Sequence, residues 1–154
     1  RHLFRMSQEI EHYRAGNQRK IFQYRHWRIL PQICYDLRFP VFMRNRNDYD
    51  IAIVVANWPS PRRMAWRTLL QARAIENQSY VIGVNRIGAD GMGLRYSGDS
   101  LAVDCKGEVL VDSPEGQAFI TTLSLDKVAL QGFRSQFPAW LDADSFILDD
   151  QTSN

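Results

Sequence analysis

Short apolar runs separated by polar turns follow one another along the chain, which is the pattern of a layered α/β fold. The run Ile51-Ala52-Ile53-Val54-Val55 has no polar alternation, so residues 50–56 are predicted to form a central strand covered on both faces. Further strands are predicted over residues 20–24, 27–33, 80–87, 100–104, 109–112 and 118–123. We expect a single domain built on a mixed sheet.

Helical spacing of apolar residues is clearest over residues 62–77, where Ser60 and Pro61 fit the N-cap and the first helical position. A short helix is predicted near residues 41–46, and a last helix over residues 125–136 with Ser124 as its cap. Residues 1–18 are predicted to be loop or a short helical turn. The tail up to Asn154 is acidic and aromatic and has no clear period.

A lone cysteine, Cys34, stands at the end of the predicted strand 27–33, where a polar turn leads into a helix. This layout predicts a nucleophile elbow, in which a strand-to-helix turn lifts the side chain clear of the sheet. The backbone N–H of Tyr35 would then point at a developing oxyanion, and Arg38 with the helix N-terminus would favour the thiolate. The pattern leaves a second interpretation open, in which Cys34 is a small buried hydrophobic residue.

The composition, with 45% hydrophobic and 23% charged residues among 154, is typical of one globular domain with its own core. Cys34 and Cys105 form neither a disulfide framework nor a zinc pattern, so we expect a reducing, cytoplasmic compartment and a structural role for Cys105. No apolar run approaches membrane-spanning length, and no membrane partner is expected.

The net charge of +2 conceals a strong bias toward arginine among the basic residues. Acidic residues flank the arginine clusters at 44–46 and 62–67 and no nucleic-acid motif occurs, so we expect no nucleic-acid partner. His2, His12 and His26 all lie upstream of Cys34 in predicted loops or turns, which disfavours a cysteine–histidine pair. No group of potential ligands has metal spacing, so no metal site is expected.

Several segments, in order along nearly the whole chain, resemble the carbon–nitrogen hydrolase (nitrilase) superfamily. They are Ile33-Cys34-Tyr35-Asp36-Leu37-Arg38-Phe39-Pro40, Arg73-Ala74-Ile75-Glu76-Asn77-Gln78, Tyr96-Ser97-Gly98-Asp99-Ser100 and Gly107-Glu108-Val109. Within the superfamily, Ala56-Asn57-Trp58-Pro59 and Asn85-Arg86-Ile87-Gly88 resemble bacterial ω-amidases, which hydrolyse ω-amides of the 2-oxoglutaramate type.

The resemblance implies a four-layer α-β-β-α sandwich, a homodimer and no cofactor. Residues 1–154 would be the C-terminal part of a single carbon–nitrogen hydrolase domain that is incomplete at its N-terminus. Cys34 matches the family's nucleophile and Glu9 its second, orienting glutamate, whereas the family's lysine would directly precede Arg1 and its general-base glutamate would lie further upstream. We therefore expect residues 1–154 alone to be inactive.

The implied reaction is hydrolysis of a small-molecule amide through a cysteine thioester, with release of ammonia and with 2-oxo dicarboxylic ω-amides as substrates. Trp58 and Arg62 are predicted to bind the substrate, Arg62 through a carboxylate. Simpler interpretations stay open: Trp58 packs in the core, Arg62 is an exposed residue of the first helical turn, and Glu9 is a solvated loop acid. A nitrilase, a carbamoylase or a non-catalytic dimerisation or binding module also stays open.

Two further groups are expected to be structural. Asp36 and Arg38 are predicted to fix the elbow by local hydrogen bonds. Arg73 and Glu76, near the end of the long predicted helix, are expected to make an interhelical salt bridge.

Overall fold

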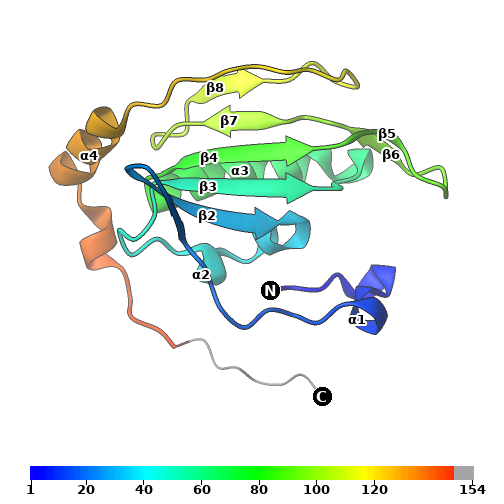
Figure 1. Cartoon of the computed structure of the whole chain (residues 1–154), viewed down its shortest axis with the longest axis horizontal. Helices are drawn as coiled ribbons and strands as arrows, with labels where there is room; N and C mark the ends of the chain where they lie inside the picture. The colour runs from blue at the N-terminus through cyan, green and yellow to red at the C-terminus, as the bar shows by residue number, and fades with distance from the viewer. Residues whose placement is uncertain (148–154) are drawn as a thin grey trace.

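A six-stranded mixed sheet forms the centre of the computed structural model, which describes residues 1–147 (Figure 1). In spatial order the strands are β1 (Phe22–Tyr24), β2 (Trp27–Ile33), β3 (Ile51–Ala56), β4 (Tyr80–Asn85), β7 (Leu101–Val103) and β8 (Val109–Asp112). The neighbours β2, β3 and β4 are parallel, and the remaining pairs are antiparallel. The predicted α/β class is confirmed.

The helices are short except for α3 and α4. They are η1 (Arg5–Ser7), α1 (Glu9–His12), η2 (Cys34–Arg38), α2 (Pro40–Met43), η3 (Ser60–Arg62), α3 (Arg63–Asn77), α4 (Lys127–Gln136) and η4 (Ala139–Asp142). A separate two-stranded sheet pairs β5 (Ile87–Ala89) with β6 (Arg95–Ser97). Among residues 1–147, none of the helices has the length and apolar character needed to cross a membrane.

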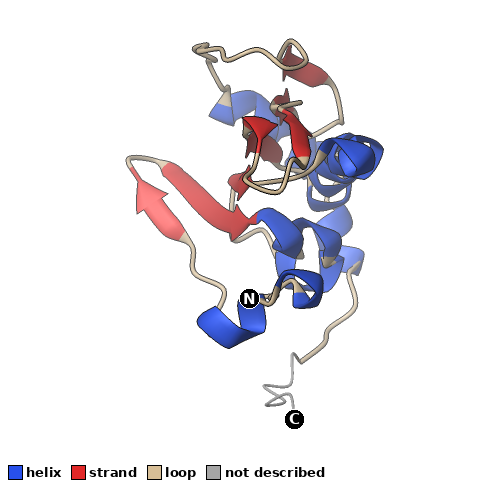
Figure 2. Ribbon diagram, turned by 90° about the vertical axis from the view of Figure 1, so that its right-hand side faces the viewer, coloured by secondary structure: helices blue, strands red, loops and turns tan. Residues whose placement is uncertain are grey.

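The main hydrophobic core lies between one face of the sheet and α3. Leu30, Val54 and Val81 point from three neighbouring strands onto Trp66 and Leu70 of the helix, and all five side chains are buried. The approach is close at Gly83 of β4, where a Cβ atom would lie only 2.4 Å from a Leu70 methyl carbon. Figure 2 shows most of the helices on one side of the strands. The packing of α3 thus explains the helical spacing in its sequence.

The opposite face of the sheet is covered only at one end. There α4 contributes Leu130 to a second cluster with Ile51, Tyr80 and Cys105, and the predicted structural role of Cys105 agrees with this burial. At the other end Val55 is 48% exposed, so the prediction that strand 50–56 is covered on both faces is wrong for the described chain. An apolar strip of this kind is the surface on which a second sheet of a sandwich packs.

Several predicted elements differ in the structure. Residues 118–123 form no strand and are mostly exposed, because no neighbouring strand pairs with them. The predicted strand 80–87 is interrupted at Arg86, where the chain leaves the large sheet and begins β5, and the short strand β6 was missed. The helix predicted near 41–46 ends at Met43.

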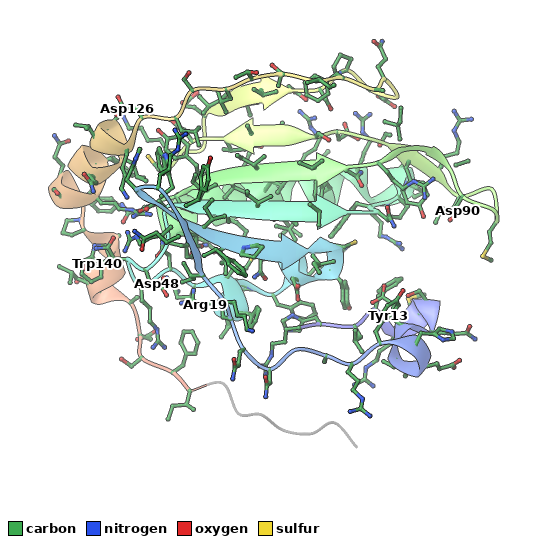
Figure 3. All side chains as sticks on the ribbon, in the orientation of Figure 1. Tyr13, Arg19, Asp48, Asp90, Asp126 and Trp140 are labelled. Atoms are coloured by element: carbon green, nitrogen blue, oxygen red, sulfur yellow. The ribbon has the colours of Figure 1, made fainter. Side chains whose placement is uncertain are left out.

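Helix starts were also predicted imperfectly. α4 is capped by Asp126, whose carboxylate accepts from the backbone N–H groups of Val128 and Ala129, and not by Ser124 (Figure 3). Ser60 begins the 3-10 turn η3 and makes no capping hydrogen bond. The carboxylate of Asp126 reaches the first free N–H groups of α4 because it directly precedes the helix.

The predicted interhelical salt bridge of Arg73 is instead an ion pair within α3. Its Nη1 lies 3.0 Å from Glu76 Oε1, one turn along the same helix. Its Nη2 donates to the backbone carbonyl of Leu37 at 2.8 Å. The buried guanidinium therefore attaches the η2 turn to α3.

A buried carboxylate joins two strands to α4. Asp50 is fully buried and lies 2.7 Å from Arg28 Nη2, 3.1 Å from Lys127 Nζ and 3.1 Å from Arg134 Nη1. Burial by itself would raise the pKa of Asp50, but the hydrogen bonds from Arg28 and Lys127 lower it to about 2. The ionised form of Asp50 is thus strongly favoured in the folded chain.

We predict that Asp50→Asn lowers the free energy of unfolding at pH 7 by about 3 kcal/mol, because it leaves buried cations without their counter-charge. The folded-state pKa of Asp50 is depressed, so its contribution is present above its unfolded pKa near 3.8 and is lost as the pH falls through about 2. Urea unfolding at pH 7 and pH 2 measures this difference, with the exposed Asp142→Asn as control. An equal deficit at both pH values would contradict the assignment.

Candidate active site

Cys34 is the first residue of η2 and directly follows β2, at a strained turn of the backbone. Its φ is +44°, in the left-handed region that a residue with a side chain rarely adopts. The strand-to-helix layout that the sequence predicted for residues 27–40 is present, and the thiol is partly exposed. Backbone strain of this kind persists only where the surrounding structure holds it in place.

Asp36 holds the turn by accepting hydrogen bonds from two segments. Its carboxylate accepts from the Ile33 N–H at 3.2 Å and from the His2 N–H at 2.9 Å, and His2 Nδ1 also lies 2.9 Å from it. Burial alone would raise the pKa of Asp36, but the hydrogen bonds from His2 outweigh it and lower the pKa. The His2 ring also stacks on Phe39, 3.7 Å between centroids. The predicted structural role of Asp36 agrees with these contacts.

The thiol of Cys34 does not have the lowered pKa that the sequence suggested. Burial raises the pKa of Cys34, the backbone N–H of Asn57 opposes that rise, and the charge of Glu9 adds to it. The Arg38 guanidinium stacks over the Trp58 ring, 4.9 Å from its centroid, and η2 is short. The expectation of an intrinsically favoured thiolate is therefore wrong, and a reaction at Cys34 needs a base.

Glu9 stands in α1, at the end of the sheet to which β2, β3 and β4 point (Figure 1). Its Oε2 accepts the Phe4 N–H at 2.8 Å, and its charge reaches Cys34. The structure thus brings Glu9 and Cys34 to one site, although 25 residues separate them in sequence. Tyr35 lies beside them, with its ring packed edge-on against Phe4 at 5.1 Å.

The two predicted substrate-binding residues lie in different surroundings. Trp58 is 3% exposed and packs in the core, and its indole N–H donates to the Arg62 carbonyl at 2.8 Å. Arg62 is exposed, with its guanidinium 5.5 Å from the centroid of the Phe4 ring, and its charge reaches Cys34. Its neighbour Arg63 points elsewhere and pairs with Asp99 at 2.6 Å.

Sequence reasoning missed part of the surroundings of Cys34. Tyr96 of β6 is close enough for the Cys34 charge to act on it, its hydroxyl donates to Asp90 at 3.0 Å, and the Arg86 guanidinium stacks on its ring at 4.6 Å. Figure 3 labels Asp90, which lies in the hairpin between β5 and β6. Tyr96 occurred in a motif used only for the family resemblance, and no local pattern marked it as part of the site.

The groups around Cys34 are those of nucleophilic acyl transfer: a thiol, a carboxylate and backbone N–H donors. Within residues 1–147, no three histidine, cysteine or acidic side chains gather closely enough to hold a metal ion. A cavity of about 580 Å³ lies over the open sheet face, between β4 and residues 117–123. None of the predicted site residues lines this cavity, although Asn85 and Arg86 do.

The carbon–nitrogen hydrolase family model matches residues 1–134, and the chain belongs to this family. It is 55% identical over 148 residues to the omega-amidase YafV of Escherichia coli K12, covering 96% of this chain and 58% of that protein. It is 39% identical over 112 residues to a 2-oxoglutaramate amidase of Paenarthrobacter nicotinovorans, covering 71% of this chain and 37% of that one.

A solved structure shows the same fold. The CN-hydrolase superfamily protein XC1258 of Xanthomonas campestris, which carries an arsenic adduct in its active site, superposes with a TM-score of 0.93 at 48% identity. The match covers 97% of this chain and 59% of that chain. The chain therefore spans a little under 60% of the length of YafV and of XC1258, and the predicted nitrilase-type α/β fold is confirmed.

We predict that limiting iodoacetamide alkylates Cys34 before Cys105, because Cys34 is partly exposed and Cys105 is buried. Burial raises the pKa of Cys34 above its ordinary value of 9.0, so the rate should keep rising with pH beyond 9. Peptide mass mapping between pH 7 and 10 measures both effects, and Cys34→Ser gives the background. Faster labelling of Cys105 would refute the assignment.

Proposed function

We propose that the complete protein hydrolyses a non-peptide amide bond with Cys34 as nucleophile. The observation that carries the proposal is the strained turn that presents a partly exposed thiol at one site with Glu9. A base removes the thiol proton, the sulfur attacks the amide carbon, and the Tyr35 N–H stabilises the oxyanion. Ammonia leaves with a proton, and water then cleaves the thioester to release the carboxylic acid and the thiol.

The raised pKa of Cys34 makes the base essential to this reaction, since little thiolate forms unaided near neutral pH. In this proposal the family's base glutamate and lysine come from residues that precede Arg1. The backbone nitrogens of Arg1 and His2 lie 3.1 Å and 2.9 Å from Asp36 Oδ1, so a lysine before Arg1 would adjoin the turn that carries Cys34. Glu9 keeps the orienting role, with one oxygen held by the Phe4 N–H.

We infer that the substrates are short ω-amides of 2-oxo dicarboxylic acids. The similarity to an omega-amidase and to a 2-oxoglutaramate amidase supports this class. Arg62 would bind the distal carboxylate, because its guanidinium is exposed and its charge reaches Cys34. Trp58 would hold the backbone of Arg62 in place through the hydrogen bond from its indole N–H to the Arg62 carbonyl. We further propose a homodimer in the cytoplasm.

The proposed reaction is tested with Cys34→Ala in the complete protein. Ammonia release from 2-oxoglutaramate should fall by about 10³-fold or more, because the other described thiol, Cys105, is buried in the cluster with Leu130. Circular dichroism and thermal unfolding should show an intact fold. Hydrolysis of the amide at the wild-type rate by the folded variant would reject the proposal.

The carboxylate contact is tested separately. Arg62→Ala should lower kcat/KM for 2-oxoglutaramate by about 10- to 100-fold, the range expected for one charge-assisted hydrogen bond, and should leave neutral aliphatic amides unaffected. Arg25→Ala removes an exposed arginine at the opposite end of β2 and serves as the matched control. An equal fall for charged and neutral amides would exclude the carboxylate contact while leaving the amidase proposal in place.

A further inference from the structure

The side chain of Asn85, the last residue of β4, hydrogen-bonds both the N–H and the C=O of one residue in the neighbouring loop. Its Oδ1 accepts the Trp58 N–H at 2.7 Å, and its Nδ2 donates to the Trp58 carbonyl at 2.9 Å. The same Nδ2 donates to the Gly98 carbonyl at 2.7 Å. One side-chain amide therefore fixes the residue after Asn57 and ties it to the turn that follows β6.

The loop that Asn85 binds contains a backbone N–H group that lies near Cys34. In the parallel register Ile33 pairs with Val55, so Cys34, which follows β2, and Asn57, which follows β3, leave the sheet at the same edge. Ala56, which immediately precedes Asn57, pairs with Asn85 on the other side of β3. The backbone N–H of Asn57 acts on the Cys34 thiol and opposes the rise in its pKa. The Asn57 N–H can reach the sulfur only while this loop keeps its position.

We propose that Asn85 is a positioning residue for the amidase reaction, which holds the Asn57 N–H on the Cys34 sulfur by clamping both backbone groups of Trp58. The inference rests on the proposed function for its consequence in catalysis. The effect on the ionisation of the Cys34 thiol can be measured without any turnover of substrate. Asn85 itself does not touch the sulfur in this assignment and acts only through the loop.

Other charged and titratable groups face the thiol and must stay unchanged in a test. They are Glu9 from α1, Asp36 from η2, Arg62 from η3 and Tyr96 from β6. A substitution that adds a charge at position 85 would act on Cys34 directly. The informative variants are therefore the neutral Asn85→Ala and Asn85→Ser.

Asn45 provides a matched control within the same chain. Its Nδ2 donates to the Tyr49 and Asn77 carbonyls at 3.0 and 2.9 Å, and its Oδ1 accepts the Asp48 and Tyr49 N–H groups at 3.0 and 3.3 Å. It thus clamps backbone much as Asn85 does, at the other end of β3, about 20 Å from Cys34. Asn45→Ala removes a comparable clamp without touching the Asn57 loop.

The experiment measures the rate of Cys34 alkylation by iodoacetamide from pH 7 to 10.5 in the complete protein carrying Cys105→Ala. Asn85→Ala should raise the apparent pKa of Cys34 by about one unit, a roughly tenfold slower reaction at pH 8, since a donor to the thiolate is lost. Asn85→Ser keeps one polar contact and should raise the apparent pKa of Cys34 by less. Asn45→Ala should lower the melting temperature but leave the alkylation profile unchanged.

An unchanged alkylation profile in a folded position-85 variant would overturn the proposal, and so would an equal shift in Asn45→Ala. If Asn85→Ala does not fold, the Asn85→Ser profile decides alone. In the amidase assay the same variants should lose kcat with little change in KM, because the substrate contacts remain. A shifted thiol profile in a protein without amidase activity would keep the positioning role and reject only the proposed function.

Discussion

The parallel pairing of β2, β3 and β4 is the constraint on which the rest of the structure depends. Their register sets Ile33, Val55 and Val84 side by side, so the three following segments leave the sheet at one edge. Functional groups gather at the carboxyl ends of parallel strands for this reason. Cys34, the loop at Asn57 and the side chain of Asn85 thereby meet, although they are far apart in sequence.

Burial raises the pKa of Asp50, Asp36 and Cys34 alike, but the net pKa shift is downward for the two carboxylates and upward for the thiol. Asp50 and Asp36 stay ionised because cations and N–H donors compensate for lost solvation. For Cys34 the Asn57 N–H and the charge of Arg62 do not offset the loss of solvation, so its pKa is raised. A partly buried thiol with a raised pKa is unreactive by itself, which protects it from adventitious oxidation and makes its reactivity depend on a positioned base.

The two faces of the sheet differ because only one has a helix along its whole length. α3 covers one face and forms the main core, whereas α4 covers only the end of the other near Ile51 and Tyr80. Ile33, Val55 and Val84 form the exposed remainder, from 48% to 68% exposed. A chain that spans 58% of an omega-amidase relative is expected to present such a face, since the family's sandwich stacks two sheets.

The sequence by itself determined the features that depend on neighbouring residues: the apolar strands, the helix over 62–77 and the turn at Cys34. The prediction of Ser124 as the cap of α4 was wrong, because Asp126, two positions further on, is of a residue type that caps equally well. Only the tertiary structure decided that Arg38 stacks on Trp58, that Arg73 holds the Leu37 carbonyl and that residues 118–123 remain unpaired. It also reversed the expected direction of the Cys34 pKa shift. The desolvation of a group depends on all the atoms that pack around it in the folded chain, so a local sequence pattern does not predict it.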